Sequence, residues 1–459
     1  MMPVEQVRAL REAHAHLLAG RFAEAIGTVR PLSGSPGGAL LYGLALAGSG
    51  AVAEAAPLLA RIAAANPHAQ HPVQDLLGLV PLDDAIPHLR AALHERPDDP
   101  RLLPLLGQRL AERGPAEEAL ALFRRATELQ PDDASAWSNL GKALAAEARF
   151  DEADHAFRQA VRFSPGDARI GYNRAVMLLK AGRFAEGWAA LRARHALPGR
   201  PPPLPGPRLE TLDIAGRRVL LLHEEGYGDT LQFIRYGKPL AERGAHVIAA
   251  VPAALTRVIA NAAGVAEVAT LSAWPHHDLW SPLLDVPALF GDPVEAPVPY
   301  LRATAGPVLP PGSKIGLVWA GDPNGLLDPL RSLPEAALAP LQDVASVQWI
   351  NLQKDRQPPF PMHDPMPRVR DFADTAAIVA QLDLVVSADT AAAHLAGGLG
   401  TPVVLLDRYD NCWRWRTGTE TTVWYPGTRI LRQPAPGDWH GVIAELVREL
   451  AAMAAARRR

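Results

Sequence analysis

Short apolar runs alternate with stretches of helical periodicity through the C-terminal half of the chain. The clearest case joins an apolar run at Leu382–Ser387 to a second run at Val403–Leu406, through a polar turn and a helical stretch that ends in Gly-Thr-Pro. Two such runs around a helix predict a βαβ unit, and therefore a parallel sheet. The turn carries Asp389 and Thr390 and follows the carboxyl end of the first strand, where open α/β sheets bind ligands.

The same alternation recurs around this unit and predicts two Rossmann-like lobes in tandem. Further strands are expected at Arg217–His223, His246–Val251, Lys314–Ala320 and Val347–Leu352. Helices are expected at Leu231–Arg243, Pro334–Leu341, Asp374–Leu382, Thr390–Leu399 and Trp439–Ala455. A proline-rich crossing at Pro293–Pro311 separates the lobes, and a cleft is expected where their strand ends face each other.

The N-terminal part follows a fixed period. Residues that recur 34 positions apart are Pro97, Pro131 and Pro165, and Gly107 and Gly141. The best unit, Ser135–Asp167, places small residues where two helices approach and a proline after the second helix, and it resembles the tetratricopeptide repeat (TPR). Earlier units are shorter and degenerate, marked by Ala25, Ala55 and Ala85. Stacked units form an α-solenoid whose groove can hold an extended peptide or a helix; alternatively, the array dimerises or supports the rest of the chain.

A proline-rich stretch, Arg194–Arg208, cannot continue a helix and predicts a semi-rigid linker. The expected organisation is therefore a repeat domain at 1–194, a linker at 195–208, a first lobe at 209–310 and a second lobe at 311–459.

Composition narrows the function classes. The 46 basic residues nearly balance the 49 acidic ones, for a net charge of −3, so the chain is not a general nucleic-acid binder. Cys412 is the single cysteine, which excludes an internal disulfide and fits a reducing compartment. The sequence shows neither a signal-peptide pattern nor an apolar run of membrane length, which favours the cytoplasm. It has no P-loop and no D-x-D pair, so a metal-held diphosphate is not indicated.

Two turns carry the candidate chemistry. The helix that opens near Asp389 offers free N–H groups to an anion, and Thr390 and His394 share one of its faces. The alternative is that Asp389 only caps the helix and His394 packs inside the fold. In the first lobe, Asp229 follows a Gly226-x-Gly228 turn that lacks the third glycine of a nicotinamide site. Its carboxylate can act as a general base or simply favour the helix dipole.

Five blocks resemble a known family in their order along the chain: LLLHEEGYGDTLQFIRY, KIGLVWAGDP…RSLP, INLQKD, DFADTAAIVAQLDLVVSADTAAAHLAGGLGTPVVLL and NCWRW…VWYPGTRILRQPAPGDW. They are similar to bacterial TPR-containing glycosyltransferases, whose C-terminal half is similar to heptosyltransferases and more distantly to O-GlcNAc transferases. The resemblance implies a GT-B fold, a nucleotide-sugar donor in the second lobe, and metal-independent transfer with the acceptor entering over the first lobe.

The resemblance also assigns roles by position. Asp229 matches the proposed base, with His223 and Glu225 as alternatives. The implied donor- and phosphate-binding positions are Asp389, Thr390, His394, Gln353, Lys354, Arg331, Ser332, Gly228 and Trp319. Trp413, Arg414 and Trp415 match an aromatic patch that can stack on a base or sugar, or pack between the lobes. The loop Gly321–Ser332 departs from the family, since many relatives carry a more basic, histidine-containing version.

Together these features predict a cytoplasmic protein O-glycosyltransferase. It would move a sugar from a nucleotide-sugar to Ser or Thr of a protein held by the repeats, with flagellin as the leading acceptor. A nonulosonic acid such as pseudaminic acid, carried by CMP, is one candidate donor. The alternatives are transfer to a lipid or polysaccharide, and a non-catalytic TPR scaffold with a decayed GT-B half. The sequence leaves open the sugar, the nucleotide, inversion or retention, and the oligomeric state.

Overall fold

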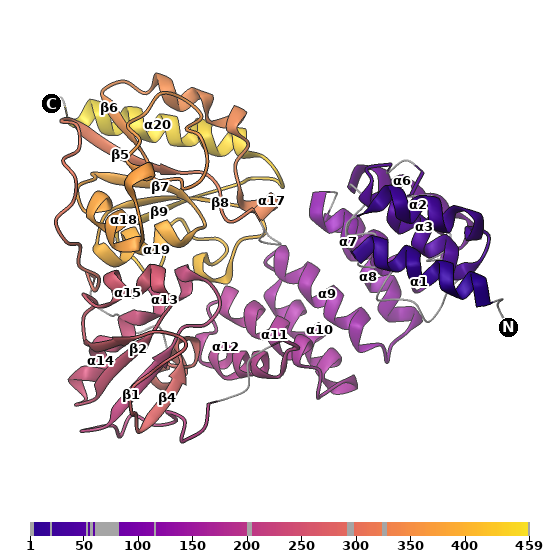
Figure 1. Cartoon of the computed structure of the whole chain (residues 1–459), viewed down its shortest axis with the longest axis horizontal. Helices are drawn as coiled ribbons and strands as arrows, with labels where there is room; N and C mark the ends of the chain where they lie inside the picture. Colours follow the sequence, from indigo (N-terminus) through magenta and orange to yellow (C-terminus); the bar gives the residue numbers. More distant parts are fainter. Residues whose placement is uncertain are drawn as a thin grey trace. The chain divides into compact units, whose positions relative to one another are not determined.

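The computed structural model describes residues 4–18, 21–51, 54–55, 58–59, 82–113, 116–199, 204–291, 298–323 and 328–457. The chain forms two compact units, Met1–Ile170 and Gly171–Arg459 (Figure 1). The described parts of the first unit are helical, and the second contains two parallel β-sheets with helices on their faces. The predicted order, helical repeats followed by an α/β part, is confirmed.

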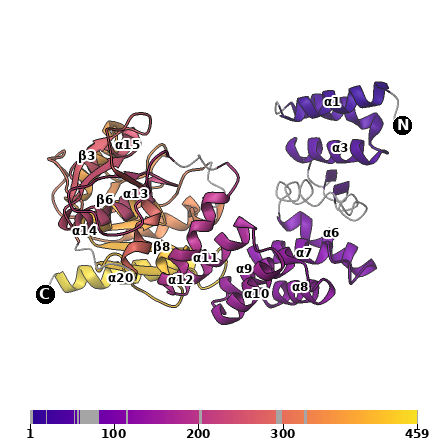
Figure 2. The ribbon, with the colours of Figure 1, turned by 90° about the horizontal axis from the view of Figure 1, so that it is seen from below.

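The first unit is built from successive helices. They are α1 (Val4–Leu18), α2 (Phe22–Val29), η1 (Arg30–Leu32), α3 (Pro36–Gly48), α6 (Leu82–Glu95), α7 (Leu102–Arg113), α8 (Ala116–Leu129), α9 (Ala134–Ala146) and α10 (Phe150–Phe163). From α6 to α10 each helix packs against the next (Figure 2). Helices α8 and α10 end two residues before Pro131 and Pro165, because the residue before a proline disfavours helical backbone.

The 34-residue period reflects a repeated contact between paired helices. A Cβ added at Gly107 would lie 2.9 Å from the Phe123 ring, and one added at Gly141 would lie 3.0 Å from the Phe157 ring. Glycine at these positions therefore lets each pair of helices approach closely enough for the phenylalanine to fill the space between them. The recurring alanines Ala25, Ala55, Ala119, Ala126, Ala153 and Ala160 are buried, whereas the side chain of Ala85 lies outside the described residues.

The contact between Gly141 and Phe157 predicts that truncation of Phe157 strongly destabilises the repeats. Phe157→Ala is expected to lower the free energy of unfolding of the repeats by about 3–5 kcal/mol, because it leaves a cavity against Gly141. Phe163→Ala is a matched control six residues along the same chain segment, since Phe163 is 40% exposed and Phe157 is 0% exposed. Denaturation of both variants, followed by far-UV circular dichroism, measures the difference; equal destabilisation would contradict the packing role of Phe157.

The second unit begins with three helical segments and a four-stranded sheet. The helical segments are α11 (Ala168–Lys180), α12 (Phe184–Leu191) and η2 (Arg192–Ala196). The sheet has the order β3-β2-β1-β4 and is parallel throughout. Its strands are β1 (Arg218–Leu222), β2 (His246–Ala250), β3 (Val265–Ala269) and β4 (Leu279–Pro282). The connecting helices are α13 (Tyr227–Phe233), η3 (Ile234–Tyr236), α14 (Gly237–Glu242), α15 (Ala253–Ile259), η4 (Leu283–Asp285) and α16 (Pro287–Phe290).

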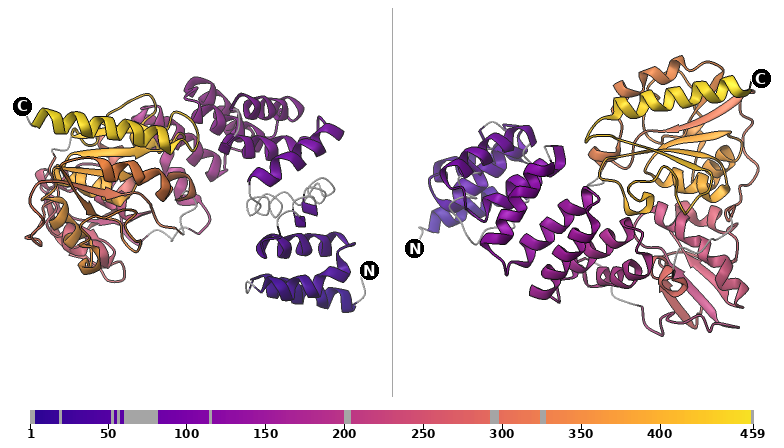
Figure 3. Two further views of the ribbon diagram at one scale, coloured as in Figure 1. Left: turned by 90° about the horizontal axis from the view of Figure 1, so that it is seen from above. Right: turned by 180° about the vertical axis from the view of Figure 1, so that it is seen from behind.

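A five-stranded parallel sheet follows, in the order β6-β5-β7-β8-β9. Its strands are β5 (Ser313–Val318), β6 (Val347–Asn351), β7 (Leu384–Ala388), β8 (Val403–Asp407) and β9 (Thr428–Arg432). The helical segments are α17 (Asp328–Arg331), η5 (Glu335–Asp343), η6 (Met366–Arg368), α18 (Phe372–Val379), α19 (Ala391–Leu399), η7 (Trp413–Trp415) and α20 (Trp439–Arg457). Strands β7 and β8 are buried along their whole length, with α20 packed on one face (Figure 3) and α19 on the other. Burial on both faces explains why these strands read as continuous apolar runs.

Several expected elements differ in detail. The helix expected at Leu231–Arg243 begins earlier, at Tyr227, and is divided into α13, η3 and α14. The helix expected at Pro334–Leu341 is the 3-10 segment η5, with Pro340 inside it. Strands β3, β4 and β9 were not predicted, because each is short and interrupted by a charged residue or a proline. The residue at the N-cap position of helix α19 is Thr390 and not Asp389.

The boundary between the units falls at Ile170/Gly171, before the expected linker at 195–208, of which 200–203 lie outside the described residues. The reason is the aromatic face of α12. The ring of Trp188 lies 5.3 Å from that of Trp413 and 6.0 Å from that of Phe233. The last helices of the repeat sequence therefore share a core with the α/β part.

Within the described ranges, no helix combines the length and the apolar character of a membrane span. Nor do any three His, Cys, Asp or Glu side chains of these ranges gather as a metal site would require.

Candidate functional site

The candidate site lies at the N-termini of two helices, each of which follows a strand of a different sheet. Helix α13 follows β1, helix α19 follows β7, and the two helices pack against each other. A Cβ added at Gly228 of α13 would lie 2.8 Å from Cδ2 of His394 and 3.4 Å from Cα of Ala391, the first residue of α19. Only glycine allows this approach, which brings two helix N-termini to one place.

Asp229 lies in the first turn of α13, and both of its carboxylate oxygens have partners. Oδ2 accepts a hydrogen bond of 2.9 Å from the backbone N–H of Gly226, and Oδ1 accepts one from Nη2 of Arg414. The side chain is only 15% exposed. Burial raises the pKa of Asp229, although Arg414 and the Gly226 N–H act in the opposite direction. The Asp229 carboxylate of the first α/β lobe is thus paired with Arg414 of the second lobe.

That cation, Arg414, is a residue whose role sequence reasoning left open between stacking and packing. Its Nε donates to Oε1 of Gln232 at 2.8 Å, its Nη1 donates to Sγ of Cys412 at 3.2 Å, and its guanidinium lies 4.2 Å from the ring centroid of Trp413. Burial is the largest influence and would lower the pKa of Arg414, but Asp229, Cys412 and Asp389 together outweigh it, so the net shift is upward. An arginine flanked by two tryptophans in an otherwise polar segment is the sequence signal that could have identified it.

His394 is enclosed in the fold. It is 4% exposed, its Nδ1 lies 2.9 Å from the hydroxyl of Tyr425, and its ring stacks on Trp415 with centroids 5.1 Å apart. Burial lowers the pKa of His394 well below its usual value, and Arg414 and Arg235 add to this effect. In this structure the imidazole is therefore neutral and packs between α13 and the aromatic patch, as the packing alternative expects.

Asp389 and Thr390 lie at the N-terminus of α19, half-buried. Oγ1 of Thr390 lies 3.1 Å from Oγ of Ser387 and makes no capping bond to the helix. The backbone carbonyl of Asp389 accepts a hydrogen bond of 3.4 Å from Nη1 of Arg331. The structure thus brings the α19 N-terminus and Arg331 together, which are the groups an anion requires.

Arg331 and Ser332 belong to a small polar cluster around Asp328. Oδ1 of Asp328 accepts from Oγ of Ser332 at 2.8 Å and from Nε of Arg331 at 3.4 Å, and Oγ of Ser332 accepts from the N–H of Gly321 at 3.0 Å. This cluster closes the loop Gly321–Ser332, of which 324–327 lie outside the described residues.

Gln353 and Trp319 join strand ends instead of facing solvent. Oε1 of Gln353 accepts from the N–H groups of Trp319 at 3.2 Å and Ala320 at 2.9 Å, and both Gln353 and Trp319 are buried. Lys354, directly after Gln353, is exposed. Of these three residues, Lys354 alone is charged and exposed.

The two alternatives for the base flank the same turn. Nδ1 of His223 lies 2.6 Å from Oγ1 of Thr230, and burial lowers the pKa of His223 despite its acidic neighbours. Glu225 is exposed and has a positive φ of 61°, an unusual backbone conformation for a non-glycine residue. The turn is therefore strained, and its geometry depends on its neighbours.

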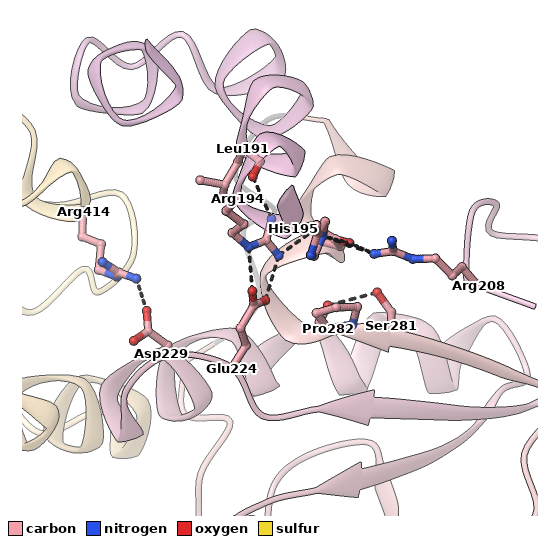
Figure 4. Close-up of polar contacts among 10 residues, drawn as sticks. Leu191, Arg194, His195, Arg208, Glu224, Asp229, Ser281, Pro282 and Arg414 are labelled. Carbon is pink, nitrogen blue, oxygen red and sulfur yellow. Dashed lines mark hydrogen bonds and ion pairs between the residues drawn. The ribbon is translucent and has the colours of Figure 1, made fainter. Parts of the chain in front are cut away.

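A buried charge network lies behind this turn (Figure 4). Arg194, 1% exposed, donates from Nε and Nη2 to the two carboxylate oxygens of Glu224, each at 2.8 Å, and its Nη2 lies 2.8 Å from Asp285. Arg208 and His195 also contact Asp285. Burial opposes ionisation of Asp285, but these partners lower its pKa to about 2. The network anchors the residue that precedes the Glu225–Asp229 turn.

Comparison with known proteins identifies the repeats. A TPR repeat family matches residues 107–147, and a tetratricopeptide repeat family matches residues 138–201. The chain therefore contains TPR repeats, as its period predicts.

Among curated proteins, Protein FlbA of Caulobacter vibrioides is 29% identical over 325 residues, which cover 58% of this chain and 53% of FlbA. The chain thus spans about half the length of that relative. Two solved structures are similar to 42% of this chain. "MamA MSR-1 C2" is 20% identical with a TM-score of 0.25 over 95% of its chain. The APC/C hetero-tetramer Cut9-Hcn1 is 20% identical with a TM-score of 0.29 over 40% of its chain. TM-scores of this size carry no conclusion about fold.

Proposed function

We propose that this chain is a glycosyltransferase that moves a sugar from a nucleotide-sugar to a Ser or Thr hydroxyl of a protein acceptor. Its α/β part would have the GT-B architecture, with the donor on the second sheet and the acceptor over the first. The TPR repeats would hold the acceptor, since solenoid grooves commonly bind extended segments. The single observation that carries the proposal is the meeting of the α13 and α19 N-termini at Gly228, the residue before Asp229.

The proposed chemistry follows from this arrangement. An acceptor hydroxyl needs a base within hydrogen-bond reach, and Asp229 would supply it. The departing nucleotide gathers negative charge as the glycosidic bond breaks, and helix N-termini and cations stabilise such charge. The N-terminus of α19, Arg331 and the exposed Lys354 would do so. Independence from metal rests on the lack of a D-x-D pair in the sequence.

Flagellin is the acceptor we propose first, and CMP-linked nonulosonic acids are candidate donors, with the cytoplasm as the compartment. A non-catalytic TPR scaffold is a second candidate. One observation favours it: His394, Gln353 and Trp319 are buried in packing contacts instead of facing a ligand. Nucleotide binding separates the two functions.

A thermal-shift panel of CMP, UDP, GDP, ADP and dTDP tests the donor site. We expect one nucleotide to stabilise the protein by about 2.7 kcal/mol at a hundred times its dissociation constant. Lys354→Gln should weaken that effect because it removes the exposed cation that follows strand β6 at the carboxyl edge of the second sheet. Lys142→Gln, an exposed lysine of α9, is the matched control and should leave it unchanged. If no nucleotide stabilises the wild type at millimolar concentration, the scaffold replaces the enzyme as the leading function.

A further inference from the structure

We propose that Arg414 is the residue that binds the phosphoryl group of the nucleotide, and that this binding releases Asp229 from its ion pair. The inference rests on the proposed function and names the step that would prepare the site for transfer. It is carried by the contacts of Arg414, by the contacts of Asp229 and by the place of both beside α19.

The guanidinium of Arg414 is held in a fixed orientation. It stacks on Trp413 and donates to Gln232, Cys412 and Asp229, while its side chain is 13% exposed. An arginine has five N–H donors. Within the described residues these three hydrogen bonds use one N–H each, which leaves two without an acceptor. A planar, oriented guanidinium with unused donors suits the two-oxygen contact that a phosphoryl group offers.

Neither carboxylate oxygen of Asp229 is available to an acceptor in this structure. Oδ1 is bonded to Arg414 and Oδ2 to the N–H of Gly226, so the carboxylate is engaged at both oxygens. A carboxylate held in this way cannot take a proton from an acceptor hydroxyl without losing a partner. The Gly226 bond belongs to the start of α13 itself, whereas Arg414 lies in η7, between strands β8 and β9 of the other sheet. Arg414 is therefore the partner that can be withdrawn.

The ligand that withdraws it would bind next to α19. Gly228, which precedes Asp229, touches the first residue of α19, so the ion pair lies beside the N-terminal N–H groups of that helix. Asp389 is close enough for its charge to act on both Asp229 and Arg414. A phosphoryl group that takes the two unused N–H groups would share the positive charge of Arg414 with Asp229 and so weaken the Arg414–Asp229 ion pair.

In the proposed transfer step, the freed Asp229 carboxylate acts as the base. Oδ1 of Asp229 takes the proton of the acceptor hydroxyl as its oxygen forms the bond to the anomeric carbon. The bond from that carbon to the phosphate oxygen breaks, and its electron pair stays on the phosphate oxygen beside Arg414. When the nucleotide leaves, Asp229 gives its proton to water and pairs with Arg414 again. The donor would consequently bind before the base becomes available.

Nucleotide affinity, measured by calorimetry on the full chain, tests this competition. With the nucleotide that stabilises the wild type, Asp229→Asn should bind about tenfold more tightly, because the competing carboxylate is gone. Arg414→Gln should bind about a hundredfold more weakly. Asp229→Asn should have no effect in the Arg414→Gln background. A purely structural role for the pair predicts no tightening, so this result distinguishes the two roles.

Two controls keep the outcome clear. Arg257→Gln removes another arginine that pairs with carboxylates of the second sheet's helices, at Asp371 and Asp374, and should leave affinity unchanged. If Arg414→Gln fails to fold, Arg414→Lys takes its place in the test, because lysine keeps the positive charge but not the planar guanidinium. Binding by the wild type without tightening in Asp229→Asn would overturn this inference and leave the donor site standing. Absence of nucleotide binding by the wild type, by contrast, would overturn the proposed function itself.

Discussion

Replacing Arg194 by methionine should lower the free energy of unfolding of the Gly171–Arg459 unit by about 3 kcal/mol. The substitution keeps an unbranched apolar stem but removes the guanidinium that bonds both oxygens of Glu224 and contacts Asp285. Removal of one partner from a buried ion pair costs more than the pair contributes, since the remaining charge stays away from water. Urea denaturation followed by tryptophan fluorescence would measure the loss.

Arg183→Met is the matched control for this prediction. Arg183 pairs with Glu186 on an exposed helix face, with side chains 33% and 53% exposed, and such pairs contribute less than about 1 kcal/mol. Similar destabilisation by both variants would mean that burial does not increase the contribution of the Arg194 network to the free energy of unfolding. Because Glu224 precedes the strained turn, the Arg194 variant should also increase hydrogen exchange at 225–229.

Under the proposed function, Asp229→Asn should lower the rate of sugar transfer by about 10²- to 10⁴-fold, the usual contribution of a positioned general base. Asparagine is nearly isosteric and can still accept the Gly226 N–H bond, so the turn should keep its shape. The rate would be followed by mass spectrometry of a purified acceptor protein with the donor whose nucleotide binds. Folding, measured by circular dichroism, should not change.

The alternatives for the base supply the comparison. His223→Gln keeps a partner for Thr230, and Glu225→Gln removes the charge of an exposed side chain. Each should retain transfer within about tenfold of wild type if Asp229 is the base. A loss confined to one of these variants would move the role of base to that residue.

Local sequence periodicity predicted the elements that carry the fold. Glycine and phenylalanine recur at the same spacing in two helix pairs, and that spacing records contacts between neighbouring helices. The buried strands β7 and β8 read as apolar runs because both of their faces are covered. The turns that carry Asp229 and Asp389 were placed correctly for a related reason: each follows directly from the strand before it.

Only the tertiary structure decided which side chains meet. The Arg414–Asp229 pair joins residues 185 positions apart, and the Arg194–Glu224 pair joins α/β and helical segments that have no common periodicity. The sequence by itself determined the repeats, the parallel βα units and the candidate carboxylate, because these depend on contacts between near neighbours in the chain. The burial of His394, the cation beside Asp229 and the place of α12 in the second unit depend on packing between distant segments, which no local pattern records.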